Sequence, residues 1–170
     1  MQEQRKIKQI PQRNEFGELE GILIPNYRKK EHFLTNPEYK LYKTLKRIYE
    51  KNENIEIFVQ VALNQIIEFN NLRAKNEFSY FKLEERSIDF VIYNTDKNNI
   101  GIVYCIELND RTHEEDDKRK ERDRILKNMF EMAEIDLKFI KLSDIDKITI
   151  NSTECFSDES IKSLLDIKED

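Results

Sequence analysis

The chain has 170 residues, about the size of one ordinary domain, and 37% of them are charged, with a formal net charge of −5. This acidic balance excludes a general electrostatic attraction to nucleic acid or to an anionic membrane, so binding of either kind would need a local basic patch. The sequence has only three glycines and neither a Walker loop nor a GxGxxG turn, which excludes the nucleotide-binding folds built on those loops.

Residues 1–32 are charged and poorly periodic. We expect an N-terminal arm there, followed by one domain over residues 33–170. The basic run Tyr27-Arg-Lys-Lys30 is either a phosphate contact or ordinary solvated surface, and the sequence leaves both interpretations open.

The first predicted helix begins at Thr35-Asn-Pro-Glu38. It starts either with a capping box from Thr35 to Glu38 or with Asn36 as the N-cap and Pro37 in the first helical position. An apolar stripe follows along one face: Leu41, Tyr42, Leu45, Ile48 and Tyr49. Glu38 stands at the head of this stripe and is predicted to point towards the core. It is therefore a candidate site residue, with a plain cap carboxylate as the alternative.

A strand is predicted over Ile55–Leu63, and residues 71–85 are expected to form a connection. A β-hairpin follows, in which Ile88–Tyr93 pairs with Ile100–Leu108. The polar loop over residues 94–99 carries the Asn and Asp that turns prefer.

Two carboxylates mark the hairpin. Asp89 and Glu107 have the same parity, so a symmetric hairpin places both on one face, together with Asn109. Glu107 lies in an otherwise apolar run, which is typical of a strand covered on both faces. A buried carboxylate needs a partner or a metal, whereas a glutamate at a frayed strand end would simply meet solvent.

The remainder of the chain predicts a helix, a strand and a helix. The helix runs from Thr112 to about Glu134, with an inner face of Ile125, Leu126, Met129, Phe130 and Ala133. A strand is predicted over residues 137–142. The closing helix runs from Asp158 to about Ile167, with Ser157 as its cap.

Neither a disulfide framework nor a cysteine zinc site is indicated, because Cys105 and Cys155 lie far apart and no CxxC spacing occurs. The N-terminus lacks the apolar core of a signal peptide, and no stretch approaches the roughly 20 apolar residues of a membrane span. We therefore expect a cytoplasmic protein that does not enter the membrane.

The order of these elements and their acidic residues resembles the PD-(D/E)xK, restriction-endonuclease-like superfamily. The resemblance is closer to one of its branches, the domain-of-unknown-function family 2726. It covers Phe33 to about Leu142 and rests on five segments in order: FLTNPEYKLYKTL, VQVAL, SIDFVIY, CIELNDRTH and RKERDRILKNMFEMAEIDLKFIKL.

The resemblance implies an α/β fold with a restriction-endonuclease-like three-layer core, in which helices flank a mixed central β-sheet. It also implies a metal site with Mg²⁺ or Mn²⁺ held by Asp89, Glu107 and the Leu108 carbonyl, a set of oxygen ligands that suits Mg²⁺. Glu38 would complete this site through a water. The implied function is a metal-dependent phosphodiesterase, a nuclease acting on DNA.

The sequence departs from the superfamily pattern at Asn109, where a lysine usually positions or deprotonates the attacking water. An amide cannot take up that proton. Lys127 is the main candidate for a relocated lysine, with Arg86 and Lys120 as lesser ones. An i to i+4 ion pair between Lys127 and Asp123 is the alternative interpretation.

His113 matches a histidine of the family pattern. It is either a general base or phosphate contact, or a cap of the helix that begins near Thr112. Because Asn109 replaces the lysine, a second function stays open, namely a catalytically inactive nuclease-fold module that binds nucleic acid or serves as an accessory interaction domain. A protein partner or a homodimer is compatible with either function.

Overall fold

The computed structural model describes residues 8–13, 19–24, 28–68, 86–109, 117–150 and 152–167. The chain divides into two compact units, Met1–Phe33 and Leu34–Asp170. In the first unit β1 (Lys8–Arg13) pairs with β2 (Leu19–Ile24) as an antiparallel hairpin. The sequence predicted only an arm here, because charged residues interrupt the strands and Pro11 removes a backbone donor from the first one.

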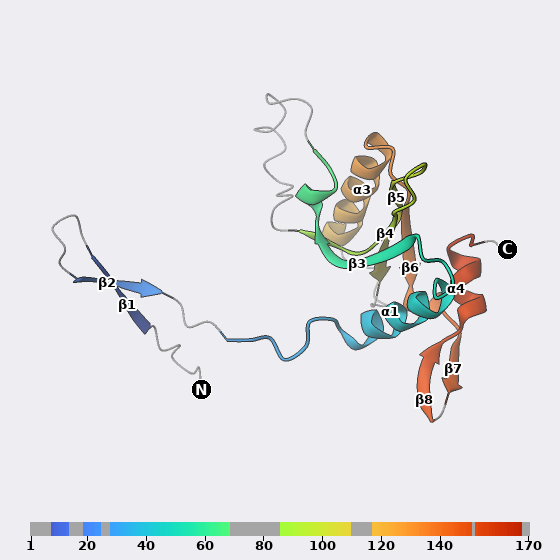
Figure 1. Ribbon diagram of the computed structural model, residues 1–170, viewed down its shortest axis with the longest axis horizontal. Helices are drawn as coiled ribbons and strands as arrows, with labels where there is room; N and C mark the ends of the chain where they lie inside the picture. The colour runs from blue at the N-terminus through green and yellow to red at the C-terminus, as the bar shows by residue number, and fades with distance from the viewer. Residues whose placement is uncertain are drawn as a thin grey trace. The chain divides into compact units, whose positions relative to one another are not determined.

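The second unit is built on a four-stranded mixed sheet (Figure 1). Its strands, in spatial order, are β3 (Ile55–Ala62), β4 (Ser87–Asn94), β5 (Gly101–Asn109) and β6 (Leu137–Lys141). The first three are antiparallel neighbours, whereas β5 and β6 run parallel. The parallel pair is joined through a helix, which is the usual form of such a crossover.

Helices pack on both faces of this sheet. α1 (Asn36–Ile48) and α4 (Asp158–Leu164) share one apolar cluster with the side chains of Tyr104, Ile106 and Leu108. α3 (Asp117–Met132) shares the other cluster with Cys105. Successive residues of β5 therefore point to opposite faces, and both faces are buried. The described chain is thus an α/β protein with a sheet between helices.

The helix termini follow from local sequence. Thr35 caps α1 and forms a reciprocal capping box with Glu38, as predicted, and Pro37 lies in the first turn. Ser157 caps α4, also as predicted, and its hydroxyl accepts from the Ser160 amide. These side chains satisfy amide groups that a helix start leaves without intrahelical partners.

The structure adds elements that the sequence did not predict. Short 3₁₀ turns, η1 (Leu63–Gln65) and η3 (Leu142–Asp144), follow β3 and β6. A hairpin of β7 (Lys147–Ile150) and β8 (Thr153–Phe156) then leads into α4. The predicted connection over residues 71–85 and the predicted helix start at residues 112–116 lie outside the described residues. Within the described part, no helix combines the length and the apolar character needed to cross a membrane.

Candidate functional site

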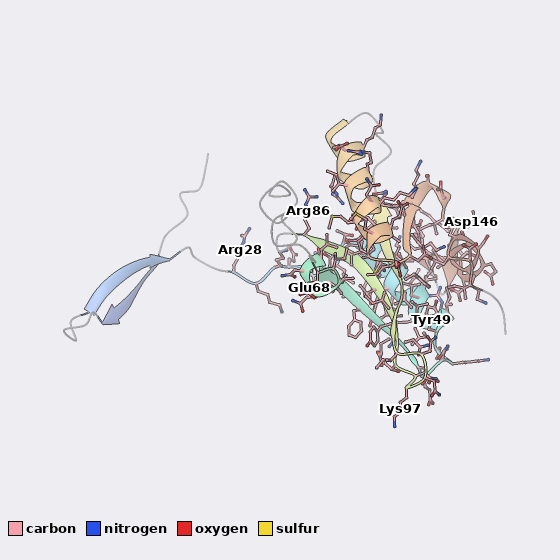
Figure 2. All side chains as sticks on the ribbon, turned by 90° about the horizontal axis from the view of Figure 1, so that it is seen from above. Arg28, Tyr49, Glu68, Arg86, Lys97 and Asp146 are labelled. Carbon is pink, nitrogen blue, oxygen red and sulfur yellow. The ribbon has the colours of Figure 1, made fainter. Side chains whose placement is uncertain are left out.

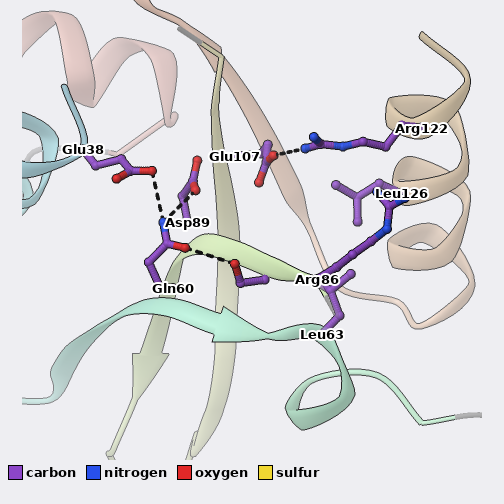
Figure 3. A pocket seen from close by; sticks show the side chains of 9 residues that line it. Glu38, Gln60, Leu63, Arg86, Asp89, Glu107, Arg122 and Leu126 are labelled. Carbon is purple, nitrogen blue, oxygen red and sulfur yellow. Dashed lines mark hydrogen bonds and ion pairs between the residues drawn. The ribbon is translucent and has the colours of Figure 1, made fainter. Parts of the chain in front are cut away.

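A polar pocket of about 320 Å³ opens where β4 begins and β5 ends. Figure 2 places Arg86, just before β4, at one end of the sheet and the hairpin loop with Lys97 at the other. The residues that line the pocket are Glu38, Gln60, Leu63, Arg86, Ser87, Asp89, Glu107, Arg122 and Leu126 (Figure 3). The three acidic residues that the sequence singled out therefore border one space.

Asp89 and Glu107 reach this pocket from neighbouring strands. Phe90 pairs with Ile106, so the next step of the ladder sets Asp89 opposite Glu107. The amide of Leu108 donates a hydrogen bond of 2.8 Å to Oδ2 of Asp89, which ties the carboxylate to the facing strand. The Leu108 side chain itself is buried in the cluster with α1.

A β-bulge makes this facing arrangement possible. Near the loop Tyr93 pairs with Ile102, and the register shifts between Ile92 and Tyr93. If the loop-end register continued unchanged, Asp89 would face Ile106 instead of Glu107. The bulge adds one residue to β5 and so brings the two acidic side chains to the same level.

Glu38 acts both as a cap and as a pocket residue, so the two interpretations of the sequence are compatible. Its Oε2 accepts a hydrogen bond of 2.6 Å from the Thr35 amide, which closes the capping box. Its Oε1 accepts one of 3.0 Å from Nε2 of Gln60. One carboxylate therefore joins the start of α1 to the pocket.

Gln60 has a central place in the pocket that sequence reasoning missed. Its Nε2 also donates to Oδ1 of Asp89 at 3.1 Å, and its Oε1 accepts from the hydroxyl of Ser87 at 3.0 Å. The available signal was a lone amide between two valines in an apolar strand segment. That pattern could not predict where the side chain points, because its direction depends on an unusual backbone conformation with a positive φ at Gln60.

Glu107 is the most buried of the three carboxylates, with 6% of its surface exposed. Its Oε1 accepts a hydrogen bond of 2.5 Å from Nη2 of Arg122, a residue of α3 that the sequence did not single out. Its Oε2 is buried and has no hydrogen-bond partner among the described residues. An unsatisfied buried carboxylate oxygen is costly, and it marks a place where a cation or a donor would be accommodated.

Burial disturbs the ionisation of both strand carboxylates. Desolvation, more than any other effect, raises the pKa of Glu107 to about 7, with a further upward contribution from the charge of Asp89 and a downward one from Arg122. Desolvation likewise raises the pKa of Asp89 to about 6, while the Leu108 amide opposes the shift. Both carboxyl groups hold protons more tightly than usual because their negative charges lack full compensation.

Asn109 and Lys127 are not among the residues that line the pocket. Asn109 ends β5, half-buried, and pairs in register with Lys141. Lys127 is exposed and pairs with Glu131 at 3.8 Å, so the predicted ion pair with Asp123 is wrong. Oδ1 of Asp123 instead lies 3.7 Å from Nε of Arg122, the residue just before it in α3.

Of the lesser lysine substitutes, Arg86 lines the pocket and Lys120 is exposed on α3. His113 lies outside the described residues.

The pocket suits a small cation held by few protein ligands. Within the described ranges, no three His, Cys, Asp or Glu side chains are placed to hold a metal ion together. Mg²⁺ does not require three, because it commonly takes one or two carboxylates and keeps several waters. Asp89 and Glu107, with the unpartnered Oε2 of Glu107, fit that smaller donor set.

The comparisons with known proteins show the family of the chain. No curated protein and no solved structure matches the chain. The model of the family described as "Protein of unknown function (DUF2726)" matches residues 30–153, a range that contains the whole pocket lining. The chain therefore belongs to the DUF2726 family.

Proposed function

We propose that this protein is a metal-dependent phosphodiesterase that cleaves DNA, with a core of the restriction-endonuclease type. The observation that carries the proposal is the convergence of Glu38, Asp89 and Glu107 on one pocket, with a buried Glu107 oxygen that has no described partner. The sheet between helices and the position of these residues at one end of β4 and β5 support the same assignment.

Asp89, Glu107 and the Leu108 carbonyl would hold Mg²⁺ or Mn²⁺. Such an ion lowers the pKa of water and neutralises charge that develops on a phosphodiester during in-line attack. Gln60 and the capping box hold Glu38 at the rim of the pocket. Burial of Glu107 keeps bulk water from competing for its oxygens.

Arg86 and Arg122 bring positive charge to the same pocket. Three carboxylates and two guanidinium groups, when all are ionised, leave one negative charge in excess, so a phosphodiester is repelled. A divalent cation would reverse this sign. We therefore expect DNA to bind the pocket only together with a divalent ion.

A second function, a binding module without turnover, is favoured by one specific residue. Asn109 stands where the superfamily usually has lysine, and an amide cannot accept the proton of an attacking water. The module would keep the pocket and bind nucleic acid or a protein partner without cleaving it.

Calorimetric titration with Mn²⁺ and Mg²⁺ tests the metal site directly. Wild type should bind Mn²⁺, and Glu107→Gln should abolish binding because a ligand is lost with almost no change in volume. The matched control is Glu56→Gln, which changes an exposed glutamate of β3 outside the pocket and should bind as wild type does. Equal affinity of Glu107→Gln and wild type would refute the site.

Cleavage of plasmid and single-stranded DNA with three variants separates the two functions. Asn109→Lys should raise cleavage, since general base assistance is worth about 100-fold or more. Lys127→Met should have little effect, because this side chain is exposed and paired with Glu131. If Lys141, which pairs in register with Asn109, already assists the attack of water, Lys141→Met should lower cleavage more than Lys127→Met does. Metal or DNA binding without cleavage in every variant would establish the binding module instead.

A further inference from the structure

The side chain of Gln60 links two carboxylates of the pocket. Its amide nitrogen donates to Oε1 of Glu38 at 3.0 Å and to Oδ1 of Asp89 at 3.1 Å. Its oxygen accepts from the Ser87 hydroxyl. Chemistry fixes this orientation, because ionised carboxylates only accept hydrogen bonds and the reversed amide would set oxygen against oxygen. One amide nitrogen thus bridges two neighbouring acidic side chains whose negative charges would otherwise only repel each other (Figure 3).

The backbone of Gln60 is strained in a way that no turn requires. Its φ is 52°, in the left-handed region that residues with a side chain avoid. The other described non-glycine residues with positive φ, Glu134, Ser152 and Asp166, all lie in turns, whereas Gln60 lies inside β3. Strain that persists within a regular element is characteristic of functional sites.

The side chains of β3 also change from one face of the sheet to the other at this strained residue. Val59 packs in the cluster with α1, but Val61, two residues on, packs in the cluster with α3. The facing strand changes in the same way, with Phe90 in the first cluster and Ile88 in the second. The reversal falls at the level of Gln60 and Asp89, where Glu38 from the α1 side and Arg122 from the α3 side line one pocket.

We propose that Gln60 is a positioning residue that preorganises Glu38 and Asp89 for a divalent cation. This inference rests on the proposed function, and the buried Oε2 of Glu107 in the same pocket, which has no hydrogen-bond partner among the described residues, is an independent sign that a cation would be accommodated there. Gln60 offers one neutral donor group to both carboxylates, and its strained backbone holds that donor in place. Without it, the two charges would move apart and bind a cation less well.

Two substitutions separate the effect of the Gln60 amide from the effect of the backbone strain. Gln60→Met removes the amide and keeps a residue with a side chain at positive φ, whereas Gln60→Gly removes the amide and relieves the strain. Both should lower the Mn²⁺ affinity measured by calorimetry, by about 10- to 100-fold, as expected for partners that orient metal ligands. The melting temperature without metal should be higher for Gln60→Gly than for Gln60→Met.

The matched control is Glu134→Gly, which relieves a φ of 56° at an exposed turn after α3, outside the pocket. It should raise the melting temperature by about 2–4 °C and leave Mn²⁺ affinity unchanged. A merely structural Gln60 would alter melting but not affinity, so wild-type Mn²⁺ affinity in Gln60→Met or Gln60→Gly would overturn the proposal.

A double-mutant cycle that combines Gln60→Met with Glu38→Gln tests whether Gln60 acts on Mn²⁺ affinity through Glu38. If Gln60 acts through Glu38, the loss of affinity in the double variant should be smaller than the product of the two single losses. If the double variant instead loses affinity by the product of the two single losses, an action of Gln60 through Glu38 is overturned.

If wild type binds no Mn²⁺, the proposed function and this inference fail together. If wild type binds and Glu107→Gln does not, while the Gln60 variants bind normally, only the inference on Gln60 fails.

Discussion

Asp89 and Glu107 combine two properties that seldom occur together in a carboxylate, burial and incomplete charge compensation. Arg122 meets one oxygen of Glu107, and the Leu108 amide meets one oxygen of Asp89. Desolvation still dominates, and it raises the pKa of Asp89 to about 6 and that of Glu107 to about 7. The folded chain therefore binds protons that the unfolded chain has already released.

This difference predicts how stability depends on pH without added metal. The ordinary carboxyl pKa values are 3.8 for Asp89 and 4.5 for Glu107, so their shifts give the folded state more protons between about pH 4 and pH 7. The stability from these two groups is complete below the ordinary values and is lost as pH rises through the raised ones. The contribution of this pair to the free energy of unfolding should therefore be smaller at pH 7.5 than at pH 5, as measured by urea unfolding.

The variant Glu107→Gln isolates the effect from the other titrating groups. The fall in unfolding free energy between pH 5 and pH 7.5 should be smaller in Glu107→Gln than in wild type. At pH 7.5 the variant should also be more stable, because repulsion with Asp89 is relieved. Glu56→Gln, an exposed change on β3, should keep the wild-type slope. A slope that Glu107→Gln leaves unchanged would contradict the assignment.

At the scale of elements, α1 and α4 are joined by a polar contact as well as by the core. Nη2 of Arg47 donates to Oδ1 of Asp158 at 2.6 Å and to the Phe156 carbonyl at 3.1 Å. The fully buried hydroxyl of Thr44 is a further acceptor for this guanidinium group. One arginine thus connects α1, β8 and the first turn of α4.

We expect Arg47→Ala to destabilise the chain by about 1–3 kcal/mol, because it leaves a partly buried carboxylate and a carbonyl without their donor. Urea unfolding followed by circular dichroism measures this directly. The control is Arg124→Ala, since Arg124 is exposed and pairs with Glu121 on its own helix. Its effect should stay within about 0.5 kcal/mol. Equal losses in the two variants would show that the contact between helices contributes nothing beyond a surface ion pair.

The hairpin β4–β5 shows why sequence reasoning gave part of the site. Parity placed Asp89 and Glu107 on one face only if the hairpin was symmetric. The register near the loop would have set Asp89 opposite Ile106, and the bulge between Ile92 and Tyr93 shifts it by one residue. A bulge of this kind has no reliable sequence signal, because it depends on how the two strands twist and pack.

At the scale of the whole molecule, long periodic elements were predictable and short exposed ones were not. The apolar stripe of α1 and the caps Thr35 and Ser157 are local signals, and the structure confirms them. All four residues of β7 are exposed, so no apolar alternation marked this strand. Gln60 and Arg122 escaped notice because tertiary packing, rather than sequence spacing, brings them to the pocket.

The division into two units predicts that the second unit folds without the first. The four-stranded sheet, its two apolar clusters and the complete pocket lining all lie within residues 34–170. A chain comprising residues 34–170 should therefore melt cooperatively at the temperature of the full-length chain, measured side by side by circular dichroism. A lower midpoint or a broad transition would show that residues 1–33 contribute to the stability of the second unit.

The double role of Glu38 has a consequence for how this protein tolerates mutation. One oxygen of its carboxylate closes the start of α1 and the other meets Gln60. In a saturation library scored for cellular abundance and, separately, for the proposed DNA cleavage, most substitutions at Glu38 should lower both scores, whereas Glu107→Gln should lower the cleavage score alone. Selection for folding would then preserve an acidic residue at position 38 even in descendants that no longer used the pocket, so Glu38 is a weaker marker of retained chemistry than Glu107.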